Sequence, residues 1–97
     1  MSEPYDIDYV DEAVADVRAF RVFDQRKVVH GVETYLTYQP KAVSRSRIKA
    51  MVQPFWSQFR LRVEDFRVYY DVDDETNRVH VLRVLAKTTE TTPEKLP

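Results

Sequence analysis

Two arginines occupy alternate positions in a short segment of this chain. Phe59, Leu61 and Val63 are apolar, and Arg60 and Arg62 lie between them. In an extended strand this alternation places the arginines on one face and the apolar residues on the other. A guanidinium group is a planar fork of donors that matches phosphate geometry, so the arginine face is a candidate anion-binding site.

A second alternating segment follows, and residues 64–65 between the two are a plausible hairpin loop. A turn there pairs Arg62 with Arg67 and Arg60 with Tyr69. The apolar pairs predicted for the other face are Val63 with Phe66, Leu61 with Val68 and Phe59 with Tyr70. Like charges that face each other destabilise a sheet, and a tyrosine ring can stack on a base. The pattern therefore makes this face a candidate phosphate-binding site.

Arginine is also common on the solvent face of antiparallel strands, where its aliphatic stem covers the sheet. Asp71 falls on the same face as the arginines and could pair with one of them. Taken alone, the residues leave both interpretations open, a phosphate-binding face and an ordinary solvated one.

Other residue types that can do chemistry have simpler explanations. The acidic residues of 71–75 predict a polar turn, with a cation site as the weaker alternative. His30 is predicted on a helix and His80 on a strand, and we expect both to be solvated. Trp56, next to Phe55, is predicted to lie in the core or at a strand edge.

The composition is that of one small domain. The chain has 97 residues, 43% of them hydrophobic, which predicts a single domain over 1–97 with frayed ends at 1–4 and 88–97. The absence of cysteine excludes disulfides and thiolate metal sites. No apolar run approaches the ~20 residues that span a membrane, and the first residues do not form a signal sequence. We expect a soluble, cytoplasmic protein that does not contact a membrane.

The formal net charge of −1 hides a segregation of charge along the chain. Residues 1–24 contain seven acidic residues and two arginines, whereas residues 41–67 contain seven basic and two acidic residues. Segregated charge produces a local field even near zero net charge, so the middle of the chain could meet an anion. The isoelectric point of about 6.1 is lower than that of a dedicated nucleic-acid-binding protein.

The first part of the chain predicts a strand and two helices. Alternation over 5–9 predicts the strand, and helical periodicity predicts amphipathic helices over 10–21 and 25–38 that form a hairpin. The expected N-caps are Asp8 or Asp11 for the first helix and Asp24 for the second. Gly31 lies inside the second helix, where a tolerated weakness is favoured over a close helix crossing.

The second part predicts strands after a basic connector over 41–49. Their expected ranges are 48–52, 59–63, 66–72 and 78–85. The alternation breaks near Leu82 and Arg83, which predicts a bulge or a strand covered on both faces. The order of elements predicts an α+β fold in which a small twisted antiparallel sheet packs against an N-terminal helical hairpin.

The segment from Phe59 to Glu75, followed by Val79 to Val84, resembles the signature of the RelE/ParE toxin superfamily. The similarity extends over residues 5–87 or so, since the strand, the helical hairpin and the basic connector come in the same order. The resemblance implies the toxin of a bacterial type II toxin–antitoxin operon. It also implies a cognate antitoxin as partner, which would cover apolar surface and the basic face.

In the RelE branch of this superfamily the toxin cleaves mRNA in the ribosomal A site. Its basic residues on the first hairpin strand and an arginine early on the second contact the RNA, and these positions match Arg60, Arg62 and Arg67. The resemblance therefore implies that these three arginines are catalytic. The full set of expected RNA-binding residues is Arg60, Arg62, Arg67, Tyr69, Lys87 and Lys49.

Cleavage by attack of a ribose 2′-hydroxyl needs a base, charge stabilisation at phosphorus and an acid. Arginines supply the charge stabilisation, and Tyr69, Lys87 or a water are the candidates for proton transfer. No metal or cofactor is required. The resemblance leaves a second class open, a binding protein without catalysis that either inhibits DNA gyrase as the ParE branch does or only binds an antitoxin.

Overall fold

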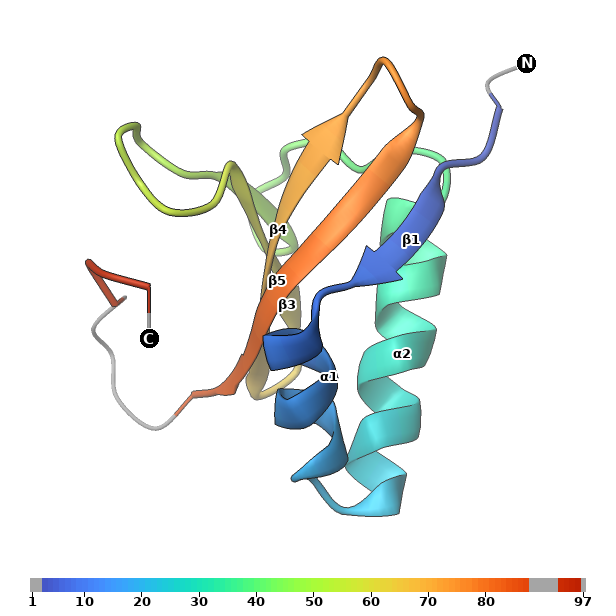
Figure 1. Cartoon of the computed structure of the whole chain (residues 1–97), viewed down its shortest axis with the longest axis vertical. Helices are drawn as coiled ribbons and strands as arrows, with labels where there is room; N and C mark the ends of the chain where they lie inside the picture. The colour runs from blue at the N-terminus through green and yellow to red at the C-terminus, as the bar shows by residue number, and fades with distance from the viewer. Residues whose placement is uncertain (1–2, 88–92, 97) are drawn as a thin grey trace.

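The structure is a computed structural model in which residues 3–87 and 93–96 are described. Five strands form one sheet, and two helices lie together on one side of it (Figure 1). The elements in chain order are β1 (Asp6–Tyr9), α1 (Asp11–Arg18), α2 (Val22–Leu36), β2 (Ile48–Ala50), β3 (Phe59–Val63), β4 (Phe66–Asp73) and β5 (Arg78–Ala86).

The strand order across the sheet is β1-β5-β4-β3-β2. Neighbouring strands are antiparallel except β1 and β5, which run parallel with Asp6 opposite Arg78 and Tyr9 opposite Val81. The predicted α+β class and helical hairpin are confirmed, but the sheet is mixed rather than wholly antiparallel. Alternation shows which face a residue occupies and does not record the direction of the partner strand.

The predicted register of the β3–β4 hairpin is confirmed at every pair. Val63 lies opposite Phe66, and Arg62 lies opposite Arg67. Glu64 in the loop adopts a positive φ of 50°, a conformation that a two-residue hairpin turn requires and that favours glycine. The predicted irregularity of the last strand is a bulge, because the β4–β5 pairing skips Leu82.

The core lies between α2 and the sheet. Val28, Val32 and Leu36 recur along one face of α2 and are fully buried, together with Leu61 and the other inward-facing strand residues. Tyr70 is fully buried as well, and its hydroxyl donates a 2.6 Å hydrogen bond to the carbonyl oxygen of Pro40. The core therefore includes a satisfied polar group, which is bonded to the start of the connector that follows α2.

The helices begin at residues other than those predicted. The N-cap of α1 is Val10, whose N–H donates to the carbonyl oxygen of Val81 at 3.0 Å. The N-cap of α2 is Arg21, so Asp24 lies in the first turn of the helix. No side chain caps either helix, and the predicted caps Asp8, Asp11 and Asp24 are wrong. Pairing of β1 with β5 fixes where α1 can start, and this tertiary constraint overrides the local preference for a polar cap.

Gly31 is where α2 approaches β3 most closely. A Cβ on Gly31 would lie 2.8 and 2.9 Å from the two methyl carbons of Val63. The glycine therefore permits close packing of α2 against the sheet. One of the two interpretations predicted close packing, but against another helix. The favoured interpretation, a tolerated weakness, is wrong.

The predicted frayed ends fall partly outside the described residues, since 1–2, 88–92 and 97 are not described. Of the described tail, Pro93 accepts a 3.1 Å hydrogen bond through its carbonyl oxygen from the indole Nε1–H of Trp56.

Neither helix in the described part of the chain is long and apolar enough to cross a membrane.

Candidate functional site

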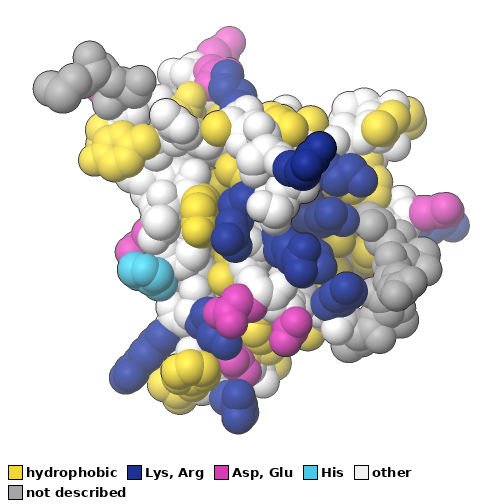
Figure 2. Space-filling view, turned by 180° about the vertical axis from the view of Figure 1, so that it is seen from behind, with side chains coloured by type: hydrophobic (Ala, Val, Ile, Leu, Met, Phe, Trp, Pro, Cys, Tyr) yellow, Lys and Arg dark blue, Asp and Glu magenta, His cyan; other side chains and the backbone are white. Residues whose placement is uncertain are grey.

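Four basic residues occupy adjacent positions on the face of the sheet that points away from the helices. Lys49 lies opposite Arg60 in the β2–β3 pair, and Arg62 lies opposite Arg67 in the β3–β4 pair. Figure 2, which views the molecule from behind, shows dark-blue side chains gathered on this side. We call Lys49, Arg60, Arg62 and Arg67 the basic face. The structure thus brings together four of the six residues that the sequence proposed for RNA binding.

The charges on the basic face act on one another. Burial lowers the pKa of Arg67, and the positive charges of Arg62 and Arg60 lower it further. The Arg67 guanidinium donates to the backbone carbonyl oxygens of Glu64 at 3.1 Å and Phe66 at 3.2 Å, while the Arg62 side chain is exposed. The like charges of Arg62 and Arg60 therefore disfavour the charged form of Arg67, and a bound anion would offset their repulsion.

Tyr69 lies directly across from Arg60, as predicted, but it is only 2% exposed. Burial raises the pKa of its hydroxyl, and the charge of Arg60 and a hydrogen bond with Arg60 act in the opposite direction. Its ring is covered by Trp56, whose ring centroid lies 4.5 Å away. The expected stacking of a base on the Tyr69 ring is therefore wrong for this structure, because other aromatic side chains occupy that surface.

Phe55 and Trp56 form the outer part of this aromatic cluster. Their rings stack with centroids 4.9 Å apart, and Phe55 lies 6.2 Å from Tyr69. Both residues are partly exposed. The prediction that Trp56 lies in the core or at a strand edge is wrong, because it packs on the face opposite the main core.

The segment 51–58, here called the aromatic loop, is held by hydrogen bonds at its base. The N–H of Met51 donates to the carbonyl oxygen of Gln58 at 2.9 Å. The N–H of Gln58 donates to the Asp71 carboxylate at 2.7 Å, and the Gln58 side-chain oxygen accepts from the N–H of Val72 at 2.8 Å. Asp71 therefore anchors the loop to β4, rather than neutralising an arginine as the solvated alternative suggested.

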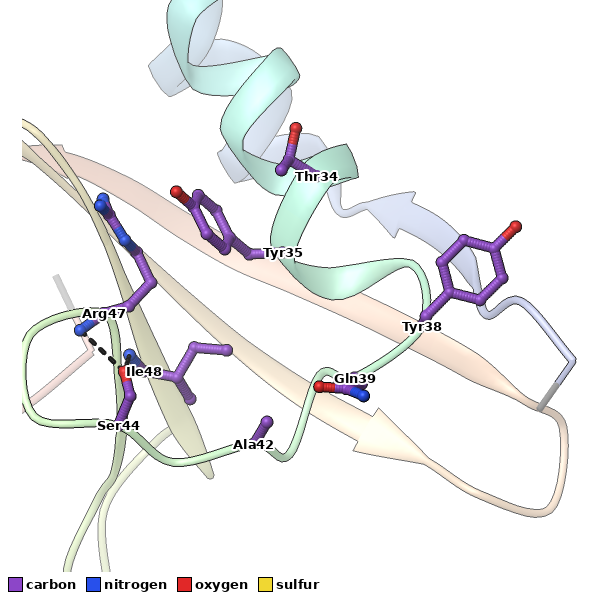
Figure 3. Close-up of a pocket in the computed structure, with 8 residues that line it drawn as sticks. All are labelled: Thr34, Tyr35, Tyr38, Gln39, Ala42, Ser44, Arg47 and Ile48. Carbon is purple, nitrogen blue, oxygen red and sulfur yellow. Dashed lines mark hydrogen bonds between the residues drawn. The ribbon is translucent and has the colours of Figure 1, made fainter. Parts of the chain in front are cut away.

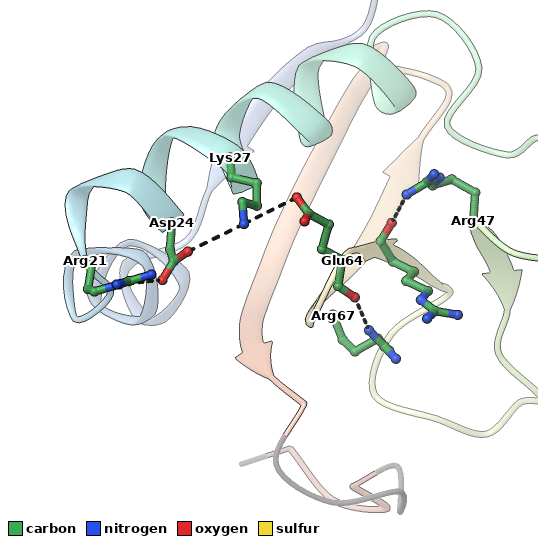
Figure 4. A network of polar contacts seen from close by, with 7 residues as sticks. Arg21, Asp24, Lys27, Arg47, Glu64 and Arg67 are labelled. Atoms are coloured by element: carbon green, nitrogen blue, oxygen red, sulfur yellow. Dashed lines mark hydrogen bonds and ion pairs between the residues drawn. The ribbon is translucent and has the colours of Figure 1, made fainter.

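Arg47 connects the basic face to α2. Its guanidinium donates to the carbonyl oxygen of Arg62 at 2.9 Å (Figure 4) and lies 4.6 Å from the centroid of the Tyr35 ring. Arg47 and Tyr35 line a hollow of about 350 Å³ beside the C-terminal end of α2 (Figure 3), where the Ser44 hydroxyl accepts from the N–H of Arg47. Sequence reasoning grouped Arg47 with the connector and missed this contact.

The tip of the β3–β4 hairpin is tied to α2 by an ion pair. The ammonium group of Lys27 lies 3.4 Å from the Glu64 carboxylate and 3.8 Å from that of Asp24 (Figure 4). The Glu64 side chain is exposed, so this pair contributes little stability.

Lys87 follows β5 at the same end of the sheet. Its backbone N–H donates to the carbonyl oxygen of Asp65, and its side chain is exposed. It therefore lies next to the hairpin tip. Whether it contacts RNA stays a prediction, as it does for the other site residues.

The acidic turn and the histidines are placed elsewhere. Asp73 accepts from the N–H groups of Glu75 and Thr76, and Asp74 binds the side chains of Lys41 and Tyr5. Within residues 3–87 and 93–96, no group of three or more acidic or histidine side chains is placed to hold a metal ion. His80 lies near Asp8, with its Nδ1 3.9 Å from the carboxylate, and His30 is exposed on α2.

No family model and no curated protein matches this sequence. Solved structures do match it. The toxin–antitoxin complex RelBE2 from Mycobacterium tuberculosis matches at 25% sequence identity with a TM-score of 0.73, over 86% of this chain and 98% of that chain.

Two archaeal complexes are similar as well. A RelE–RelB complex from Pyrococcus horikoshii matches at 16% identity and a TM-score of 0.70, over 87% of this chain and 96% of that one. A RelB–RelE complex from Methanococcus jannaschii matches at 16% identity and a TM-score of 0.56, over 81% and 88% of the two chains. The α+β fold described above is therefore similar to that of the RelE toxins in these toxin–antitoxin complexes.

Proposed function

We propose that this protein is the toxin of a type II toxin–antitoxin module and cleaves mRNA on the ribosome in the cytoplasm. The observation that supports this most directly is the basic face, where Arg62 and Arg67 oppose each other at a cost to the isolated fold. Burial lowers the pKa of Arg67, and the charges of Arg62 and Arg60 lower it further, so a bound polyanion would offset the repulsion on this face.

The chemistry that fits this face is attack of a ribose 2′-oxygen on the adjacent phosphorus. The bond from phosphorus to the 5′-oxygen breaks and leaves a 2′,3′-cyclic phosphate and a 5′-hydroxyl end. One proton leaves the 2′-hydroxyl and one is delivered to the 5′-oxygen, so no oxidant or metal is consumed. Arg60, Arg62 and Arg67 would stabilise the charge that develops on the phosphoryl oxygens.

The experiment is primer extension on mRNA in a purified translation system. Wild type should cut mRNA in the presence of ribosomes, and Arg60→Ala, Arg62→Ala and Arg67→Ala should each reduce cleavage. A lost phosphate contact costs on the order of 1–3 kcal/mol in binding, and more where it stabilises the transition state. Arg26→Ala, which removes an exposed arginine on α2, is the matched control. Uncut mRNA with wild type at ribosome-saturating amounts would reject the nuclease function.

The similar solved structures are complexes with a RelB-type antitoxin, which supports an antitoxin as the partner of this chain. The protein encoded in the adjacent reading frame is the candidate. Co-expressed with this chain, it should co-purify with it and abolish the cleavage of mRNA. If that protein neither binds nor inhibits, the partnership proposed here is wrong.

A second candidate is a binding protein without catalysis, either a gyrase inhibitor or a homologue that only binds antitoxin. The burial of Tyr69 favours it, because a hydroxyl with a raised pKa that is covered by other rings is a poor proton-transfer group. Inhibition of gyrase supercoiling with intact mRNA would select the gyrase inhibitor. Absence of toxicity in growing bacteria would select the antitoxin-binding homologue.

A further inference from the structure

Aromatic rings and arginines lie side by side on the outer face of the sheet. Tyr69 is directly opposite Arg60 and hydrogen-bonded to it, and Trp56 packs on Tyr69. Proteins that bind single-stranded nucleic acid without reading its sequence combine these two features, a basic track for the phosphates and rings on which bases stack. The adjacency places a stacking surface about one strand spacing from a phosphate-binding side chain.

We propose that Phe55 and Trp56 of the aromatic loop stack against a base of the single-stranded RNA whose phosphates contact the basic face. This inference rests on the proposed RNA-binding function and names the part of the molecule that would contact a base. Phe55 and Trp56 are partly exposed, whereas Tyr69 beneath them is 2% exposed, so the outer two rings are the accessible ones.

The aromatic loop is built to hold its rings in place. The Gln53 side-chain amide donates to the carbonyl oxygens of Met51 and Ser57, and its side-chain oxygen accepts from the N–H of Phe55. With Asp71 anchoring the other end, the rings are positioned before a ligand arrives. A pre-organised surface loses little conformational entropy on binding, which favours affinity for a flexible single strand.

The order Tyr69, Trp56, Phe55 also sets the geometry of the contact. Phe55 and Trp56 are nearly parallel, with an interplanar angle of 29°, whereas Trp56 is tilted by 43° against Tyr69. Tyr69 thus supports the pair from below and is a positioning residue. Stacking on a ring is tolerant of base identity, so we expect affinity for single-stranded RNA with little sequence preference.

Trp56 is the only tryptophan of the chain, so its fluorescence reports on this site alone. The full chain is titrated, without ribosomes, with a short single-stranded RNA and in parallel with inorganic polyphosphate. RNA should quench the fluorescence. Polyphosphate, which carries the charge without bases, should compete with RNA but leave the fluorescence unchanged. Equal responses to the two polyanions, or no quenching by RNA that demonstrably binds, would overturn the proposal.

Variants separate stacking from packing. Phe55→Leu keeps apolar bulk without a ring and should weaken RNA binding about 5- to 100-fold, whereas Phe55→Tyr should bind as wild type does. Val52→Ala, at an 86% exposed position of the same loop, is the matched control. Thermal melts confirm that each variant is folded. RNA binding by folded Phe55→Leu at wild-type affinity would also overturn the proposal.

The salt dependence gives an independent readout. Arg62→Ala should reduce the slope of binding against salt concentration, and Phe55→Leu should leave the slope unchanged, because only the arginine displaces counterions. Failure of this inference differs from failure of the proposed function. Cleavage of mRNA without fluorescence quenching rejects the stacking surface alone, and quenching without cleavage rejects only the nuclease function.

Discussion

The carboxylate of Asp16 on α1 accepts two hydrogen bonds from the guanidinium of Arg83 on β5, at 2.6 Å from Nε and 2.8 Å from the terminal nitrogen. It also accepts from the backbone N–H of Val84 at 2.9 Å. The two side chains are only 14% and 16% exposed. Asp16 thus ties the first helix to the last strand directly after the bulge.

Removal of this carboxylate should destabilise the fold. Asp16→Ala removes two hydrogen bonds from a partly buried guanidinium and the acceptor of the Val84 N–H, which should cost about 2–3 kcal/mol. For a domain of this size the melting temperature should fall by roughly 10–20 °C. Glu12→Ala, an exposed acid on the same helix, is the control and should change little. Equal melting temperatures for the two variants would contradict the role assigned to Asp16.

Gly31→Ala should destabilise the protein even though alanine favours helices. The gain in helix propensity is about 1 kcal/mol, but the new Cβ would lie within 3 Å of the Val63 methyl groups, and overpacking of this kind costs about 1–3 kcal/mol. Denaturant unfolding measures the net effect. The loss should shrink in a Val63→Ala background, where the methyl groups are gone. An additive double-mutant cycle would show that Val63 is not the cause.

The stability of the fold should decrease at alkaline pH because of Tyr9 and Tyr70. Burial, with a smaller effect of Glu33, raises the pKa of Tyr9 to about 12, and burial also raises the pKa of Tyr70. The folded state then keeps protons that the unfolded state releases above pH ~10. This contribution to stability is complete below pH ~10 and is lost as the pH rises through the folded-state pKa, by about 1.4 kcal/mol per pH unit for each tyrosine.

Phenylalanine substitutions test both tyrosines. Among the described residues the buried Tyr9 hydroxyl has no hydrogen-bond partner, so Tyr9→Phe should be neutral or stabilising at pH 7 and should flatten the alkaline decline. Tyr70→Phe loses the bond to Pro40 and should cost about 1–2 kcal/mol at pH 7. Urea unfolding midpoints measured between pH 7 and 11 test both predictions. If stability falls with pH as steeply in Tyr9→Phe as in wild type, Tyr9 does not contribute to the alkaline decline.

Arg47 should matter for stability through its two contacts. Arg47→Ala loses the hydrogen bond to Arg62 and the contact with Tyr35, a combined cost of about 1–2 kcal/mol. Arg47→Lys should recover only part of the lost stability, because an ammonium group lacks the planar guanidinium that can stack on a ring and donate a hydrogen bond at the same time. Arg45→Ala, at an exposed position two residues earlier, should stay within about 0.5 kcal/mol. Full recovery by lysine would mean that charge alone accounts for the effect.

The basic face could be predicted because strand alternation and hairpin register are local. Once the loop is placed at 64–65, the pairs Arg62–Arg67 and Arg60–Tyr69 follow from a period of two. The same argument predicted either a bulge near Leu82 or a strand covered on both faces, and the structure has the bulge, because an extra residue interrupts the alternation. Both inferences depend on residues close together in the sequence, whose alternation shows which face of the strand each one occupies.

What could not be predicted depends on contacts between distant segments. The N-cap of α1 is set by the bond from Val10 to Val81, and the burial of Tyr69 depends on a loop whose position Asp71 determines. The pair Phe55–Trp56 after Pro54 was the available signal for that loop, because two adjacent aromatics between two strands need a surface to cover. The sequence does not show which face of the sheet they cover.

The parallel pairing of β1 with β5 has a consequence for synthesis of the protein. Asp6, near the start of the chain, finds its partner Arg78 only after the intervening residues have been made. Until β5 has left the ribosome, the nascent chain carries two amphipathic helices and an incomplete sheet. The strand β4, which carries Arg67, then lacks one of its two neighbouring strands. Pairing over such sequence separation slows folding. The sheet that displays the basic face is therefore completed only after β5 has been made.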